Sequence, residues 1–274
     1  MGLLFAGEAG DLTWGARTIG DRLNAADLDG ENASIPGRDG ALWTPRKTLQ
    51  ELELTVKTFI TGADYTGGMP SAAGGRAIVR ARYGKLLQVL RNPDALTEIR
   101  DDETNRAALV ELISGPSPDT MAGGTRAEVE FDLRVPAGCW KDTAAFDTGT
   151  VNVANGTVLS LPAGAMGGDL PIVDAVITLT PPASNITITE PGGQSLTFAG
   201  ALPAGNPTVI SCSAWTAIQA GASTDYLPRI TWTAAEILPI RSRGSTPPTL
   251  TFAMSGTTTA TKVRVQGRRR WYTA

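Results

Sequence analysis

The chain has 274 residues, with 24 Lys and Arg against 27 Asp and Glu, 31 Gly, 18 Pro, two Cys and no His. The missing histidine excludes Ser-His-Asp and Cys-His nucleophile systems and the catalytic zinc and facial-triad iron sites that use imidazole ligands. Cys139 and Cys212 are too far apart for a CxxC redox pair, and the net charge of −3 disfavours nucleic-acid binding as the main task.

The first predicted elements are a turn, a strand and a loop. Residues 36–40 (Pro-Gly-Arg-Asp-Gly) lie between short apolar runs and indicate a tight turn. Residues 51–60 alternate between apolar and polar side chains, a period of two that predicts a half-buried strand. Residues 61–75 contain five Gly and no periodicity, so we expect a mobile loop or an extended arm there.

A helix and two more strands are predicted next. Residues 76–91 place apolar side chains at helical spacing, and Asn92-Pro93 ends the pattern. The Lys and Arg residues of this segment are interpreted as a solvated helix surface. Residues 107–114 predict a strand that ends at Gly115-Pro116, and residues 126–135 repeat the alternation of the first strand.

The second half of the chain contains short runs rich in Thr, Val and Ile, separated by Gly, Pro or Asn. Many short strands with such breaks are typical of a β-sandwich. We predict strands over residues 150–161, 172–179, 185–189, 195–198, 208–212, 229–233, 249–254 and 261–272.

Charge is distributed unevenly between the two halves. Residues 1–146 hold 16 Lys and Arg and 21 Asp and Glu, which leaves few charges for the rest of the chain. We therefore predict a boundary near Asp147, with an N-terminal domain of residues 1–146 and a C-terminal domain of residues 147–274. The expected fold class is mainly β: an α+β N-terminal domain with one helix, then a β-sandwich.

No group of residues predicts catalysis, a cofactor site or a metal site. The six carboxylates after residue 146 show no pairing of the kind that glycoside hydrolysis requires. The run Asp101-Asp102-Glu103 is contiguous, whereas calcium loops alternate their ligands, so we expect it to cap a hairpin. The Gly-rich segment 164–168 lacks the Lys-Ser/Thr of a phosphate loop and is interpreted as a turn.

Two further features have a structural and a functional interpretation. Trp215 and Trp232 are expected to pack in a core or an interface, and stacking on a sugar ring is the alternative. Arg268-Arg269-Arg270 is expected to belong to a charged edge strand that blocks unwanted pairing, with nucleic-acid contact as the alternative.

The order of these features resembles the distal tail proteins (Dit) of long-tailed bacteriophages, the siphoviruses. The resemblance is carried by the turn at 35–40 followed by Trp43, strand 51–60, helix 76–91, strand 127–135 ending at Pro136 and Trp140, the segment 168–171, and the Arg-rich and aromatic segment 263–272.

This resemblance implies a structural role. It implies an N-terminal domain that closes into a homohexameric ring and a C-terminal galectin-like β-sandwich. The resemblance further implies that this ring is an adaptor of the virion tail tip, or baseplate, that joins the tail tube to the host-binding hub. The implied partners are the chain itself, the tail tube protein, the hub or tail-associated protein and the tape measure protein. DNA only passes through the lumen, and a net −5 over residues 1–146 suits such a lumen.

Galectins bind sugar partly through histidine, which this chain lacks, so the sandwich is expected to be a platform for protein contacts or a decorated outer domain. Arg38, Asp39, Tyr65 and Met69 lie in the loops best placed to reach a neighbouring subunit. A chain without a membrane span or signal peptide, with two lone cysteines, is expected to be made in the host cytoplasm without membrane insertion. The alternatives are a tail-tube subunit, a carbohydrate-binding adhesin that uses Trp215 or Trp232 and, more distantly, an enzyme.

Overall fold

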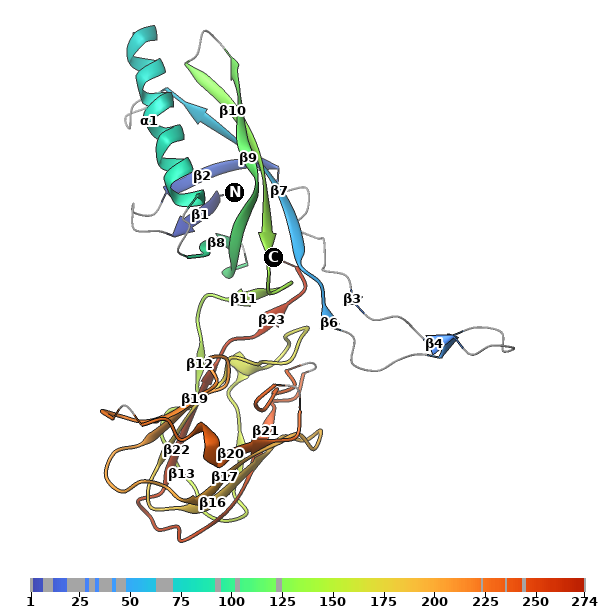
Figure 1. Ribbon diagram of the computed structural model, residues 1–274, viewed down its shortest axis with the longest axis vertical. Coiled ribbons are helices and arrows are strands. Elements are labelled where there is room, and N and C mark those ends of the chain that lie inside the picture. Colours follow the sequence, from blue (N-terminus) through green and yellow to red (C-terminus); the bar gives the residue numbers. More distant parts are fainter. Residues whose placement is uncertain are drawn as a thin grey trace. The chain divides into compact units, whose positions relative to one another are not determined.

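A computed structural model of the chain describes residues 2–6, 12–18, 28–29, 33–34, 41–42, 48–62, 71–91, 95–101, 104–121, 125–222, 224–234, 236–242 and 245–273. Contacts divide the chain into two compact units. Unit 1 comprises residues 1–143 and 272–274, and unit 2 comprises residues 144–271. Strands dominate both units, and α1 is the one α-helix of the described residues, so the predicted mainly-β class is confirmed (Figure 1).

Unit 1 is built around a closed antiparallel sheet. Its strands, in spatial order, are β1 (Gly2–Ala6), β2 (Leu12–Thr18), β7 (Leu52–Thr61), β10 (Arg126–Val135), β9 (Arg106–Met121) and β8 (Thr97–Asp101). β8 pairs back with β1, which closes the sheet, and β11 (Trp140–Asp142) adds to the start of β9. Two short pairs lie outside this sheet: β3 (Leu28–Asp29) with β6 (Thr48–Leu49), and β4 (Ala33–Ser34) with β5 (Ala41–Leu42).

The two alternating segments form the centre of this sheet. β7 and β10 pair along their whole length, from Thr61 opposite Arg126 to Leu52 opposite Val135. Their apolar side chains are buried and those between them are half-buried or exposed, as the period of two predicts. Both predicted strands are confirmed.

The prediction that a strand ends at Gly115-Pro116 is wrong. β9 continues to Met121, with Pro118 opposite Val129 of β10. Beyond Val110, β9 has a hydrogen-bonded neighbour on one side only among the described residues. Proline is tolerated in a strand of this kind because its missing N–H can face the unpaired side.

Helix α1 spans Ala72–Leu90 and packs along β7, β10 and β9 (Figure 1). It begins four residues before the predicted start, so residues 72–75, expected in the loop, are helical; residues 63–70 lie outside the described part of the chain. Val79, Leu86, Val89 and Leu90 form its buried stripe.

Unit 2 is a sandwich of two antiparallel sheets, as predicted. The first sheet contains β12 (Phe146–Asp147), β22 (Lys262–Gly267), β15 (Val176–Thr180), β18 (Thr208–Ser211) and β19 (Thr216–Gln219), and β13 (Val151–Asn152) also pairs with β22. The second contains β14 (Val158–Ser160), β21 (Thr249–Ser255), β16 (Ser184–Thr189), β17 (Ser195–Ala201) and β20 (Ile230–Trp232). The remaining elements are the short helices η2 (Ala163–Ala165) and η3 (Leu227–Arg229), and β23 (Arg270–Trp271). Apolar side chains from both sheets form one core.

One prediction for unit 2 is wrong, and another holds only in part. Residues 150–161 are not one strand, because β13 and β14 belong to different sheets and are separated by a turn at Gly156, whose φ is +82°. Arg268 and Arg269 follow the end of β22 at Gly267, and β22 lies between β12 and β15, so it is not an edge strand. Arg270 begins β23, the last strand in the order of its sheet, so the prediction of an edge strand holds for this residue alone.

Candidate functional site

The four predicted contact residues, Arg38, Asp39, Tyr65 and Met69, lie outside the described residues. β4 and β5, which flank residues 35–40, pair antiparallel with Ser34 opposite Ala41. The turn predicted at residues 36–40 lies outside the described residues.

One face of β7, β10 and β9 carries a dense group of charged side chains. We call it the acidic face; it consists of Glu51, Glu53, Lys57, Glu111, Arg126, Glu128, Glu130, Asp132 and Arg134. Among the described side chains of this face, carboxylates outnumber cations six to three. It follows directly from the strand period, which turns every second side chain away from the buried face.

The cations of the acidic face are all engaged. Lys57 Nζ lies 3.1 Å from Glu130 Oε1. Arg134 binds two carboxylates, with 2.6 Å from Nε to Glu111 Oε1 and 3.1 Å from Nη1 to Glu51 Oε2. The hydrogen bond with Glu111 is the main cause that raises the pKa of Arg134 above its ordinary value.

Arg126 lies 4.5 Å above the Phe59 ring, a cation–π contact on the same face. The surplus carboxylates remain, so the acidic face presents net negative charge to its surroundings.

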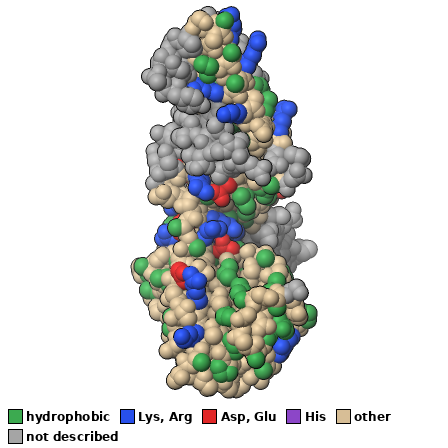
Figure 2. All heavy atoms as spheres, turned by 90° about the vertical axis from the view of Figure 1, so that its left-hand side faces the viewer, with side chains coloured by type: hydrophobic (Ala, Val, Ile, Leu, Met, Phe, Trp, Pro, Cys, Tyr) green, Lys and Arg blue, Asp and Glu red, His purple; other side chains and the backbone are tan. Residues whose placement is uncertain are grey.

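Helix α1 has the opposite charge. Its sequence contains Arg76, Arg80, Arg82 and Lys85 and no Asp or Glu. Arg82 Nη1 donates to Thr61 O at 2.6 Å, which fastens the helix to the end of β7. Figure 2, which turns the α1 side toward the viewer, shows Lys and Arg side chains over the uppermost part of unit 1. No helix among the described residues is both long and apolar enough to cross a membrane.

Two glycines set the distance between α1 and β7. A Cβ added to Gly62, next to the end of β7, would lie 2.5 Å from Gly75 O in the helix, and Gly62 N donates to Thr125 O at 2.8 Å. Only glycine allows this approach of two backbones. The sheet therefore carries the helix on one face and the charged residues on the other.

A groove lies where α1 ends and β9 loses its second neighbour. It has a volume of about 660 Å³ and is lined by Leu90, Arg91, Ala95, Leu96, Thr97, Val110, Glu111, Leu112, Ile113 and Gly115. Leu96 and Ile113 are exposed in it. The strand edge and the apolar side chains together make this part of β9 suited to pair with another strand.

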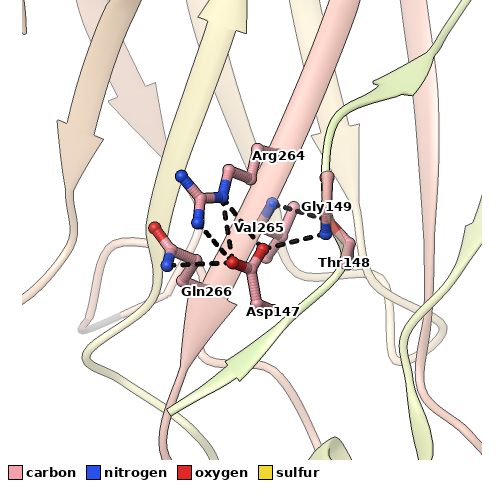
Figure 3. Close-up of polar contacts among 6 residues, drawn as sticks. All are labelled: Asp147, Thr148, Gly149, Arg264, Val265 and Gln266. Atoms are coloured by element: carbon pink, nitrogen blue, oxygen red, sulfur yellow. Dashed lines mark hydrogen bonds and ion pairs between the residues drawn. The ribbon is translucent and has the colours of Figure 1, made fainter.

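Asp147 is the centre of a group of hydrogen bonds on the first sheet of unit 2. Asp147 accepts hydrogen bonds from Arg264, from Gln266 Nε2 at 3.3 Å and from Gly149 N at 2.8 Å (Figure 3). The bond with Arg264 is the main cause that lowers the pKa of Asp147 from 3.8 to about 2. This cluster joins β12 to β22.

Two other carboxylates of unit 2 make contacts of their own. Asp225 Oδ1 accepts from Ala217 N at 2.9 Å, and the buried Glu190 lies 3.8 Å from Arg241 Nε. The structure brings no three His, Cys, Asp or Glu residues together in a metal-binding group among the residues it describes.

The hairpin expected at Asp101 is confirmed. β8 ends at Asp101 and β9 starts at Arg106, and Asp101 Oδ2 accepts from Thr104 Oγ1 at 2.6 Å and from Thr104 N at 3.3 Å.

The two tryptophans do not both lie in the core. Trp215 is 41% exposed, whereas Trp232 is half-buried against the sandwich core. Their rings form a T-shaped pair with centroids 5.2 Å apart. Trp215 has φ +54°, a left-handed conformation that is rare for a bulky residue. Packing in the core is therefore the wrong interpretation for Trp215.

The acidic face and the free edge of β9 were not singled out from the sequence. The alternation of residues 126–135 contains the signal for the acidic face, because its outward positions are all charged. No sequence signal shows the free edge, because it depends on where β8 ends relative to β9.

Among solved structures, SPP1 Dit (gp 19.1), described as a paradigm of the hub adsorption apparatus in phages that infect Gram-positive bacteria, is similar to this chain with a TM-score of 0.64 and 14% identity. The similarity covers 98% of this chain and 99% of that chain. Two structures of the phage P2 baseplate in its activated conformation, with Ca and with Sr, give TM-scores of 0.44 and 0.40 at 11% and 10% identity, covering 100% of this chain and 99% of theirs. No family model matches the sequence, and no curated protein matches it. The chain therefore has the fold of SPP1 Dit over almost its whole length, and the resemblance inferred from the sequence is confirmed at the level of the fold.

Proposed function

We propose that this chain is a structural, non-enzymatic protein of a bacteriophage tail tip, in which six copies form a ring that joins the tail tube to the host-binding hub. The observation that carries the proposal is the similarity to SPP1 Dit, which extends over both units and over almost all of both chains. A likeness limited to one sandwich would support only a shared domain, since one fold serves many functions.

The free strand edges of unit 1 support ring formation. Beyond Val110, β9 lacks a second neighbour among the residues that the structure describes. On the far side of the same three strands, β2 pairs with β7 only at Lys57 and Thr58, which leaves Leu52–Val56 without a second neighbour among the described residues. A sheet with one open edge on each side can pair head to tail with further copies, and head-to-tail contacts close into a ring when the rotation allows it.

The acidic face supports a lumen through which DNA passes. A basic channel binds phosphates and releases counterions, which retards a moving duplex. A face with six carboxylates and three paired or stacked cations repels the phosphates instead. We therefore orient the acidic face toward the lumen and the basic helix α1 away from it.

The proposed setting is the tip of the virion tail, with the tail tube protein, the hub or tail-associated protein and the tape measure protein as neighbours. The sandwich of unit 2 serves as the platform for protein contacts on this assembly. We propose that four residues in the predicted loops of unit 1 contact a neighbouring subunit: Arg38, Asp39, Tyr65 and Met69.

Native mass spectrometry and negative-stain imaging of the purified chain test this proposal. We expect single rings of six copies. Long stacked tubes would instead favour a tail-tube subunit, and a monomer at micromolar concentration together with tails that lack the ring would refute the proposal.

A charge placed on the free edge gives a sharper test. Ile113→Lys puts a lysine beside the open part of β9, where natural edge strands use lysine to prevent pairing. We expect it to reduce the ring fraction while the circular dichroism spectrum is unchanged. Val158→Lys, at a 61% exposed position of unit 2, is the matched control that retains the ring. Equal ring fractions in both variants would contradict pairing through this edge.

A further inference from the structure

The two strand edges of unit 1 that lack a second neighbour among the described residues are open over the same stretch of the sheet. β10 pairs with β7 on one side and with β9 on the other. We call two residues level when they lie opposite the same residue of β10. Thr55 and Ser114 are level, because both lie opposite Asp132. The open residues 52–56 of β7 are therefore level with the part of β9 that directly follows Val110.

Both edges also become unsuitable for pairing at one common level. Pro116 and Pro118 interrupt β9, and a proline has no N–H to donate to a partner strand. Pro118 is level with Thr58 of β7, because both lie opposite Val129. At Thr58 the edge of β7 is already occupied by β2, through Ala16. The usable stretches of the two edges therefore match each other in position and in length.

The usable part of the β9 edge, residues 111–115, runs along the groove of about 660 Å³ at the end of α1. Leu96, Leu109 and Ile113 lie in the groove or beside it, and they are the large exposed apolar side chains of unit 1 within its described part. Exposed apolar side chains that gather in one place mark a surface that another chain covers.

The direction of the strands distinguishes two ways of joining copies. β7 and β9 run in the same direction, because both are antiparallel to β10. Rotation about a ring axis that lies roughly along the strands preserves this direction, so β9 of one copy meets β7 of the next as a parallel pair. It also keeps the acidic face of every copy on the same side. A two-fold axis would instead bring two identical edges together.

We propose that residues 111–115 of one copy pair in parallel with residues 52–56 of the next copy, in the register that places Ser114 beside Thr55. The pairing rests on the proposed function and specifies how its ring is joined. In this register Glu53 of the next copy lies beside Glu111, whose charge is balanced by Arg134 Nε at 2.6 Å.

The test crosslinks the full chain through cysteines placed on the two edges. Neighbouring strands lie about 4.8 Å apart, inside the Cα separation of about 4.4–6.8 Å that a disulfide needs. Under mild oxidation, the variant with both Ser114→Cys and Thr55→Cys is expected to give covalent multimers of up to six chains on non-reducing gels. Each single variant is expected to run as a monomer, because only unlike edges meet. The native cysteines, Cys139 and Cys212, are buried.

A matched control moves one of the two cysteines along the same side of the same strand. Thr61 is on the side of β7 that carries Thr55, but about 20 Å further along the strand. The variant with both Ser114→Cys and Thr61→Cys is therefore expected to give no crosslink.

Hydrogen exchange tests the same register without any substitution. The chain is compared as a ring and after dilution to a monomer, with native mass spectrometry to identify each state. We expect the amides of residues 53–56 and 111–114 to exchange about tenfold more slowly or more in the ring, because exchange then requires the interface to open. Residues 119–121 are expected to exchange equally in both states.

The outcomes separate this pairing from the ring itself. If the unchanged chain forms rings, but Ser114→Cys with Thr55→Cys gives no crosslink and the amides exchange equally, the pairing is wrong and the proposed function stands. Covalent dimers from Ser114→Cys alone would show two β9 edges meeting across a two-fold axis. Crosslinks through Thr61→Cys would show a shifted register, and either result overturns the proposal. If the unchanged chain forms no ring at all, the proposed function fails, and the pairing fails with it.

Discussion

Replacing Gly62 with alanine tests how α1 is seated on the sheet. The new Cβ would lie 2.5 Å from Gly75 O and 2.7 Å from Gly75 Cα, and both are backbone atoms that cannot turn aside. Since real Cβ contacts are not shorter than 3.0 Å, the helix and the strand must separate by about 0.5 Å or more. Overpacking of this kind costs about 1–3 kcal/mol. The reduced freedom of the unfolded chain returns about 0.4–1 kcal/mol, so we expect a net loss of about 1–2 kcal/mol.

The chain also offers a matched control with the opposite sign. Gly84 lies within α1, is exposed, and an added Cβ would meet nothing within 4 Å. Gly84→Ala is therefore expected to stabilise the helix by about 0.8–1 kcal/mol, the difference in helix propensity. Both variants make the same chemical change, so the sign of the effect depends only on the surroundings.

Hydrogen exchange of the α1 and β7 amides, read by mass spectrometry, measures both effects without requiring the two units to unfold together. A loss of 1.4 kcal/mol makes exchange about tenfold faster. We expect faster exchange in Gly62→Ala and slower exchange in Gly84→Ala, with unit 2 unchanged. Unchanged or slower exchange in Gly62→Ala would refute the reasoning that backbone contact seats the helix.

Two further predictions concern unit 2. Because the folded pKa of Asp147, about 2, is below its ordinary value of 3.8, the bond with Arg264 stabilises unit 2 above pH 4 and is lost as the pH falls toward 2. In Asp147→Asn, and likewise in Arg264→Ala, the urea concentration at the unfolding midpoint is therefore expected to fall less between pH 4 and pH 2 than in the unchanged chain. The same pH dependence in both variants as in the unchanged chain would contradict this. Burial is the main cause that raises the pKa of Cys212 to about 12, so we expect no reaction with iodoacetamide at pH 8 until urea is added, as peptide mapping would show. Rapid labelling of the folded chain would disprove it.

The sequence predicted best those strands whose alternation of apolar and polar residues matches the burial of one strand face in the structure. Residues 51–60 and 126–135 alternate because one side of each strand faces the interior and the other faces water. Strands β1, β2 and β8 were not predicted, because their short segments have little alternation of their own and depend on neighbours from distant parts of the chain. Gly115-Pro116 looked like an end because the benefit of pairing with β10 is invisible in the local sequence.

The candidate site shows the same limit. The alternation within each strand predicts which charged residues point outward. That these residues form one acidic face follows only from the register in which β7, β10 and β9 pair. The outward threonines of the second sheet of unit 2 were hidden in the same way, since threonine in a short strand is first a sign of β propensity. Only the pairing of Thr231, Thr197 and Thr187 shows that the hydroxyls share one surface.

The path of the chain around residues 105 and 106 has a consequence for how this protein can change. Thr143, the last residue before unit 2, donates to Asn105 O at 2.9 Å, and Thr273, just after unit 2, accepts from Arg106 Nη1 at 2.8 Å. The chain thus leaves unit 1 and re-enters it at adjacent positions. Unit 2 is therefore a domain inserted into unit 1 between two neighbouring positions. A short loop, or an unrelated domain whose termini lie close together, can replace it and leave the closed sheet intact. Recombination can therefore exchange one part of this protein without redesigning the other.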